Sequence, residues 1–293
     1  MAGFDDDSDR QFIRDSDHEF DRDVVVVGGG ASGLSATVFL ARYDLDALVF
    51  DRGNSAIKRC YSLENYLGFL GIRPDTFLEL ARDHARYEGA TVEDEMVVEV
   101  TRVEDSEDHE TGFRVRTQDG REVTTRYVLA AAAYDGDYLA PLADGEFHDE
   151  GDHPVRTDEE GRTEIDGLYV AGWLSGGPHQ VVTAAGHGAR VAKSLVEDRR
   201  KARGYWEEVA SYWDWRVPEG QYGSEEWERE VDEWIDGTIP DDAEFDPERV
   251  ERVREAIKTE RLDFQRSEAE RARRLEAGRE RLQEHLFGEE KTE

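Results

Sequence analysis

The order of apolar and polar positions near the start of the chain predicts a strand, a turn and a helix. Four valines at 24–27 are followed by glycines at 28–30, and apolar side chains then recur at Leu34 and at 38–40. A wholly apolar run of β-branched residues favours a strand that is buried on both faces of a parallel sheet. A second apolar run at 47–50 predicts a neighbouring strand that ends at Asp51.

The glycines between the first strand and the helix have the spacing G-x-G-x-x-G, at Gly28, Gly30 and Gly33. Glycines let the chain turn tightly and let a pyrophosphate approach the backbone, while unpaired amides at the helix N-terminus face the anion. An acid at the end of the second strand can accept hydrogen bonds from ribose hydroxyls. The pattern therefore predicts a dinucleotide site, for NAD or FAD, rather than a turn without a ligand. The expected contacts are Gly28, Gly30, Ala31, Ser32, Gly33, Asp51 and Arg52.

The next part of the chain predicts the remaining elements of an α/β domain. Residues 59–72 resemble an ordered loop, and an amphipathic helix follows at 73–92 and closes near Gly89. Three strands at 96–105, 112–120 and 121–133 form a small β-meander. A polar connection at 134–163, a short strand within 167–173 and a helix within 176–198 complete the pattern. The core face of the amphipathic helix is expected at Phe77, Leu78, Ala81, Ala85 and Tyr87.

The composition changes after about residue 197, because five of the six tryptophans lie between 206 and 234 and charged helices follow. Asp246 and Pro247 predict the start of a helix. Its broken apolar stripe at Val250, Val253, Ile257, Leu262 and Phe264 is followed by a solvated helix. We expect an acidic segment at 1–21, a domain at 22–197 that contains the connection at 134–163, and a charged, tryptophan-rich helical region at 198–293.

The charge of the chain limits its partners. Seventy acidic residues stand against 37 basic ones, which gives a formal net charge of −33 and makes nucleic acid an unfavourable partner. Lysine occurs only at 58, 193, 201, 258 and 291. This composition resembles that of proteins from salt-accumulating haloarchaea and predicts a halophilic protein, the alternative being an acidic mesophilic one. No apolar run approaches the roughly 20 residues that cross a bilayer, and the first residues do not resemble a signal peptide. We therefore expect a cytoplasmic protein without membrane insertion.

Several separate segments resemble the FAD-binding portion of the thioredoxin-reductase-like pyridine nucleotide-disulfide oxidoreductases. They are "VVVVGGGASGLSAT", "ENYLGF" at 64–69, "GLYVAGW" at 167–173 and "HQVVTAAGHGA" at 179–189. The resemblance implies a Rossmann-like FAD/NAD(P)-binding fold, and its last segment favours FAD over NAD. In the family that segment wraps the ribityl chain, and its helix dipole stabilises reduced flavin. The resemblance implies these flavin neighbours: Asn65, Gly172, Trp173, Gln180, Val181 and Ala184, with Val100 near the adenine.

The sequence also departs from the family pattern. Only residues 134–163 separate the two FAD segments, where the family carries an NADPH-binding domain, and Cys60 is the single cysteine, so the redox C-x-x-C is absent. Trp173 and His187 replace two family aspartates. We therefore expect an FAD-dependent oxidoreductase that takes electrons from an unidentified donor or carrier, with an unknown substrate and without ordinary thioredoxin-disulfide reductase activity. The alternatives are a non-catalytic flavoprotein or scaffold and an NAD(P)-binding dehydrogenase. A homodimer is a further possibility for the chain.

Two residues are candidates for catalysis. Cys60 precedes the loop that resembles one beside the flavin, where it could form a thiolate or a transient adduct. The alternative interpretation is a small buried hydrophobic residue without a chemical role. His179 precedes the last helix, where it could donate protons to reduced flavin or be an ordinary surface histidine. The sequence predicts no metal site.

Overall fold

A computed structural model of the chain describes residues 20–104, 111–133, 136–142, 155–177, 179–240 and 242–287. The chain divides into two compact units, Met1–Ala192 and Lys193–Glu293. Helix α3 (Val181–Ala202) contains both this division and the sequence-based limit at 197. The acidic segment predicted at 1–21 and part of the connection predicted at 134–163 lie outside the described residues.

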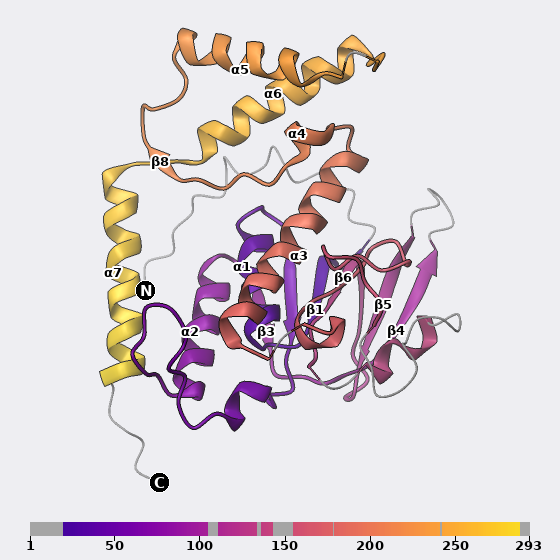
Figure 1. Ribbon diagram of the computed structural model, residues 1–293, viewed down its shortest axis with the longest axis vertical. Helices are drawn as coiled ribbons and strands as arrows, with labels where there is room; N and C mark the ends of the chain where they lie inside the picture. The colour runs from indigo at the N-terminus through magenta and orange to yellow at the C-terminus, as the bar shows by residue number, and fades with distance from the viewer. Residues whose placement is uncertain are drawn as a thin grey trace. The chain divides into compact units, whose positions relative to one another are not determined.

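The first unit is built on a mixed sheet with the strand order β3-β2-β1-β6-β5-β4 (Figure 1). The parallel part contains β1 (Arg22–Val27), β2 (Ala47–Phe50), β3 (Thr91–Glu93), β6 (Glu122–Ala130) and β7 (Leu168–Val170). Strands β4 (Val97–Glu104) and β5 (Thr111–Thr117) run antiparallel beside β6 and form the meander. The predicted α/β fold class with a parallel sheet and a small meander is confirmed. The three-residue strand β3 is an addition that no local pattern predicts.

The register of β6 explains how one strand joins the parallel and antiparallel parts. Residues Thr125 to Ala130 pair with β1, whereas on the other edge the first residues of β6 pair with β5 and the last with β7. Strand β1 lies between β2 and β6, and Val24, Val25 and Val26 are fully buried. This agrees with the expectation that an all-valine strand is central and covered on both faces.

Two helices of the first unit contact each other. Helix α1 (Ala31–Ala41) follows the glycine turn, and α2 (Pro74–Tyr87) ends before Gly89, whose positive φ of 105° suits a helix C-terminus. The predicted core face of α2 is only partly right. Phe77, Leu78 and Ala85 are buried, but Tyr87 is 52% exposed.

The second unit contains α4 (Glu207–Ala210), α5 (Glu225–Thr238), α6 (Pro247–Asp263) and α7 (Glu268–Phe287), with a two-residue pairing of β8 (Val217–Pro218) and β9 (Gln265–Arg266). The Asp246 side chain accepts the Glu248 amide at 3.2 Å, so the predicted cap is confirmed. None of the residues of α7 is buried, in agreement with the predicted solvated helix. The buried cluster consists of Trp206, Val209, Ile235, Val253 and Ile257.

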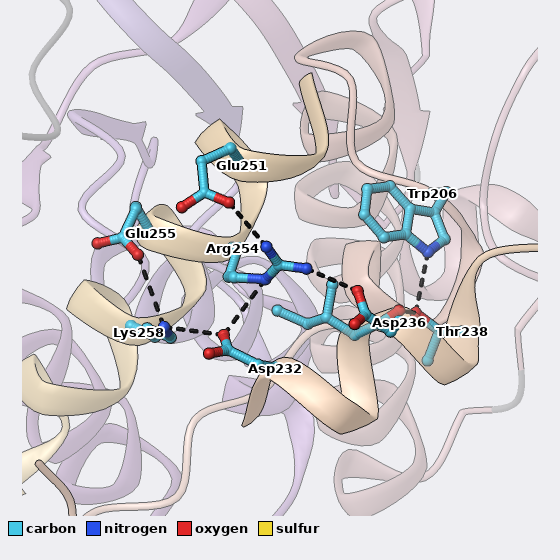
Figure 2. A network of polar contacts seen from close by, with 9 residues as sticks. Trp206, Asp232, Asp236, Thr238, Glu251, Arg254, Glu255 and Lys258 are labelled. Carbon is cyan, nitrogen blue, oxygen red and sulfur yellow. Dashed lines mark hydrogen bonds and ion pairs between the residues drawn. The ribbon is translucent and has the colours of Figure 1, made fainter. Parts of the chain in front are cut away.

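A polar network joins α5 to α6 (Figure 2). The Arg254 guanidinium contacts Asp236 at 2.6 Å, Asp232 at 3.2 Å and Glu251 at 2.7 Å. Burial lowers the pKa of Arg254, but the charge of Asp236 and the pairing with Glu251 outweigh this effect, so the pKa is raised. Lys258 shares Asp232 at 2.8 Å. Charged side chains therefore hold together two helices that share only a small apolar cluster.

Among the described residues, no helix combines the length and the apolar character that crossing a bilayer would need.

Candidate functional site

A cavity of about 290 Å³ lies where β1 and β2 end in the first unit. Open α/β sheets bind their ligands outside the carboxyl ends of parallel strands, and this cavity has that position. It is lined by the glycine turn and by segments that are distant in the sequence. The lining residues are Val27, Gly28, Gly29, Gly30, Ala31, Ser32, Phe50, Asp51, Arg52, Asn54, Ser55, Ala56, Ile57, Arg59, Cys60, Glu95, Met96, Val97, Ala131, Ala132, Ala133, Tyr138, Trp173, His179, Val181 and Ala184.

At Gly28 and Gly33 the glycine turn is packed so closely against backbone atoms that a side chain is excluded. Gly28 has a φ of 111°, and a Cβ there would lie 2.8 Å from the Ala131 carbonyl oxygen. A Cβ on Gly33 would lie 1.9 Å from the Gly28 carbonyl oxygen. At Gly30, by contrast, a Cβ would meet only Ser55 Oγ, at 3.5 Å. Because Gly30 also lines the cavity, the missing side chain leaves space for a ligand rather than for protein.

The first turn of α1 presents its backbone amides at this place. No side chain caps the helix, and the first intrahelical bond is the one from the Leu34 amide to the Gly30 carbonyl at 3.0 Å. The amides before Leu34 therefore lack partners within the helix, and such amides bind anions. The turn and the helix together fit a pyrophosphate.

Asp51 at the end of β2 is 5% exposed and lines the cavity. Its carboxylate accepts the Gly53 amide at 3.0 Å and forms a hydrogen-bonded ion pair with Arg82 of α2. The second arm of the guanidinium donates to Asp94 at 2.8 Å. Burial lowers the pKa of Arg82, but the hydrogen bonds and charges of the two aspartates outweigh it, so the pKa is raised and the group stays charged.

The segment that precedes α3 is tied to two other parts of the first unit. The Gly172 amide donates to His187 Nδ1 at 3.0 Å, which requires that nitrogen to be unprotonated. Burial lowers the pKa of His187, helped by the charge of Arg190, and this favours the neutral ring. The side-chain amide of Asn65 donates through Nδ2 to Gln180 Oε1 at 2.6 Å, so the loop at 64–69 contacts this segment.

Close packing also holds the segment and α3 against the first turn of α1. A Cβ on Gly172 would lie 2.4 Å from Ser32 Oγ, and a Cβ on Gly188 would lie 2.0 Å from the Ser32 carbonyl oxygen. Trp173 and His179 line the cavity with their rings edge to face. Small residues therefore bring the glycine turn and the segment resembling the family's flavin-binding stretch to one cavity.

The structure brings most of the predicted residues to the cavity and leaves some away from it. Gly33, Asn65, Gly172 and Gln180 do not line it, although each contacts a neighbouring segment. Val100 is fully buried in the apolar core on β4, and Met96 and Val97 line the cavity in its place. The residues that do line it are Gly28, Gly30, Ala31, Ser32, Asp51, Arg52, Trp173, Val181 and Ala184, with the catalytic candidates Cys60 and His179.

Cys60 does not fill the core. It is exposed and lines the cavity, so its interpretation as a small buried hydrophobic residue is wrong. Sequence reasoning also did not indicate Arg82, which pairs with Asp51 without lining the cavity, because arginine is rarely buried unless it is paired. Among the described residues, no group of three or more histidine, cysteine, aspartate or glutamate side chains could hold a metal ion.

Comparison with known proteins identifies the class of protein. The signature of the family described as pyridine nucleotide-disulphide oxidoreductase matches residues 4–172, and the chain belongs to this family. A probable thioredoxin reductase of Arthroderma benhamiae is 29% identical over 145 residues, which are 43% of this chain and 35% of that protein. The match thus spans about a third of the length of that relative.

Solved structures agree with the fold. The thioredoxin reductase of Gloeobacter violaceus has a TM-score of 0.52 at 18% identity, with 64% of this chain and 100% of that chain covered. The thioredoxin reductase of Streptococcus pyogenes has a TM-score of 0.53 at 12% identity, with 61% and 98% covered. The resemblance predicted from the sequence is confirmed.

Proposed function

We propose that the chain is an FAD-dependent oxidoreductase that holds the flavin in the cavity of its first unit. The observation that carries this proposal is that one cavity joins the glycine turn, Asp51 and the residues Trp173, Val181 and Ala184. A nucleotide without a flavin would need only the glycine turn and Asp51. A bound flavin would supply one- or two-electron transfer, while the protein supplies its position and electrostatic surroundings.

The chain's own groups have separate roles in this proposal. The amides at the start of α1 bind the pyrophosphate, and Asp51 accepts hydrogen bonds from the ribose. Helix α3 begins at Val181, which lines the cavity, so the positive end of a 22-residue helix stabilises negative charge there. His179 is the candidate for moving a proton at this end.

The source of electrons is the second part of the proposal. Cys60 is the only cysteine in these 293 residues, so they cannot form an internal dithiol. We therefore propose an external donor or carrier, and no ordinary thioredoxin-disulfide reductase activity.

An absorption spectrum of the full-length protein, purified in high salt, tests the cofactor. We expect a flavin spectrum with one FAD per chain, and loss of the flavin in Gly33→Val, whose added side chain meets the Gly28 carbonyl. Gly186→Ala is the control, because a Cβ there meets nothing within 4 Å. A colourless protein that carries NAD would indicate a dehydrogenase instead.

Anaerobic mixing tests the electron source. We expect NADPH and NADH to bleach the flavin poorly and an external one- or two-electron donor to bleach it faster. Fast, saturable bleaching by micromolar NADPH would contradict the proposed donor. A flavin that no donor reduces would indicate a non-catalytic flavoprotein.

A further inference from the structure

Helix α2 places an arginine on its buried face. Arg82 is 8% exposed and lies on the same side of the helix as Leu78 and Ala85. A buried guanidinium has to be compensated by charge and hydrogen bonds, because its transfer out of water is costly. Packing alone therefore does not explain why an arginine lies on this face of α2.

The guanidinium spans two carboxylates with different surroundings. One arm pairs with Asp51, whose side chain is 7% exposed, and the other donates to Asp94, whose side chain is 73% exposed. A planar fork fixes both directions at once, which a lysine could not do. Asp51 lines the cavity and Arg82 does not. Arg82 can therefore act on a ligand only through Asp51.

The Asp51 carboxylate is held on several sides. Oδ2 is paired with Arg82, Oδ1 accepts the Gly53 amide at 3.0 Å, and a Cβ on Gly29 would come within 2.5 Å of Oδ2. A carboxylate has about four acceptor sites, so these contacts leave room for hydroxyl donors. The group is thus fixed in place and can still accept hydrogen bonds.

We infer that Arg82 is a positioning residue that aims the Asp51 carboxylate at the ribose hydroxyls of an adenine nucleotide in the cavity. The inference rests on the proposed function, because it takes the ligand to be an adenine dinucleotide. Arg82 then sets how strongly the site distinguishes a ribose from a deoxyribose, and not merely how stable the domain is.

Calorimetric titration of the full-length protein, freed of any flavin that co-purifies, with ADP and with 2′-deoxy-ADP tests this. A hydrogen bond to a charged carboxylate predicts about tenfold tighter binding of ADP in the parent protein. We expect Arg82→Gln to reduce this preference below about threefold, and Arg82→Lys to give an intermediate value. If Arg82 had a purely structural role, its substitution would weaken the binding of ADP and of 2′-deoxy-ADP equally, and the ratio of the two affinities would stay unchanged. Arg86→Gln, on the same helix with a 43% exposed side chain, is the matched control and should keep the parental ratio.

The possible outcomes distinguish a failure of the Arg82 inference from a failure of the proposed function. If ADP binds but Arg82→Gln keeps the parental ratio, or if the parent shows no preference, the inference fails while the cofactor proposal stands. If neither FAD nor ADP binds the parent, both fail. If Arg82→Gln does not fold, Arg82→Lys decides: a ratio reduced at least about twofold supports the inference, and an unchanged ratio overturns it.

Discussion

The two compact units of the chain are stabilised in different ways. In the first unit, a buried sheet is combined with backbone approaches so close that a single methyl group would collide, as at Gly33 and Gly188. In the second, a cluster of five buried side chains is supplemented by charged contacts between α5 and α6. The first unit should therefore be sensitive to added volume, and the second to lost volume and to salt.

The distribution of chromophores allows the two units to be followed separately. Five of the six tryptophans lie in the second unit, so tryptophan fluorescence mainly reports its unfolding. In the proposed function, flavin release reports the first unit.

The largest effect is expected from Trp206→Ala in the second unit. Trp206 is 5% exposed, its ring centroid lies 5.1 Å from that of Phe245, and its indole N–H donates to Thr238 at 3.0 Å. Truncation leaves a cavity in a small core, so the free energy of unfolding should fall by about 3–5 kcal/mol. Chemical denaturation followed by tryptophan fluorescence measures this.

Trp215→Ala is the matched control for that variant. Trp215 is 72% exposed, so the change in the free energy of unfolding should stay within about 0.5 kcal/mol. Equal losses in the two variants would show that the five-residue cluster is not what stabilises the second unit. If Trp206→Ala released its flavin while the fluorescence of its remaining tryptophans still reported a folded second unit, the substitution would have destabilised the first unit rather than the second. That outcome would contradict the comparison between the units.

A smaller effect is expected from one methyl group in the first unit. In Gly188→Ala the Cβ would lie 2.0 Å from the Ser32 carbonyl oxygen, so α3 must move from the first turn of α1. We expect a loss of about 1–3 kcal/mol and weaker flavin retention. Gly186→Ala lies two residues away with nothing within 4 Å, and should be neutral or stabilising by up to about 1 kcal/mol. Similar behaviour of the two variants would refute the close approach.

The same contrast explains how much of the fold the sequence predicts. Strands β1 and β2 and helices α1 and α2 follow from local apolar patterns, and the order strand, glycines, helix and acid predicts the dinucleotide site. The burial of Arg82 could not be predicted in this way, because its partner Asp51 is 31 positions away in the sequence. Only the folded sheet brings the two together.

The second unit was predicted less completely for a similar reason. A single charged pattern covers residues 245–287, but the helix breaks between α6 and α7. There Phe264 is 5% exposed under the Arg216 guanidinium, at 4.6 Å, and β9 pairs with β8. These contacts link residues about fifty positions apart, which no local periodicity reveals.

A third prediction concerns charge in the second unit. Arg254→Gln removes contacts to Asp232, Asp236 and Glu251 and should cost about 1 kcal/mol in 0.1 M salt, or in the lowest salt at which the chain folds. The cost should shrink in 1 M salt, where the screening length is about 3 Å instead of about 10 Å. Denaturation followed by tryptophan fluorescence at both salts measures it.

Arg229→Gln is the control for Arg254. Its side chain is 64% exposed and its nearest carboxylate oxygen is 3.8 Å away, so its cost should be near zero at both salts. An equal loss for Arg254→Gln at low and high salt would show that the arginine acts through packing of its aliphatic stem rather than through its charge.

The smallest effect is expected from the pH dependence of the contact between His187 and Gly172. Burial lowers the pKa of His187 in the folded protein, and a protonated Nδ1 could no longer accept the Gly172 amide. The contribution to stability is therefore fully present above the ordinary histidine pKa of about 6.5. It is lost as the pH falls from there through the lower folded-state pKa, because the unfolded chain takes up the proton first.

His187→Asn isolates this contribution from the many carboxylates, because its amide oxygen can accept the Gly172 amide without titrating. The stability of the parent relative to this variant, followed by flavin release at pH 7.5 and 5.5, should decrease toward the lower pH. A difference that is constant with pH would mean that His187 does not change its protonation state in this range. A difference that grows toward low pH would mean that the folded state prefers the charged ring. The tryptophan signal of the second unit should not follow the change, since the contact lies within the first unit.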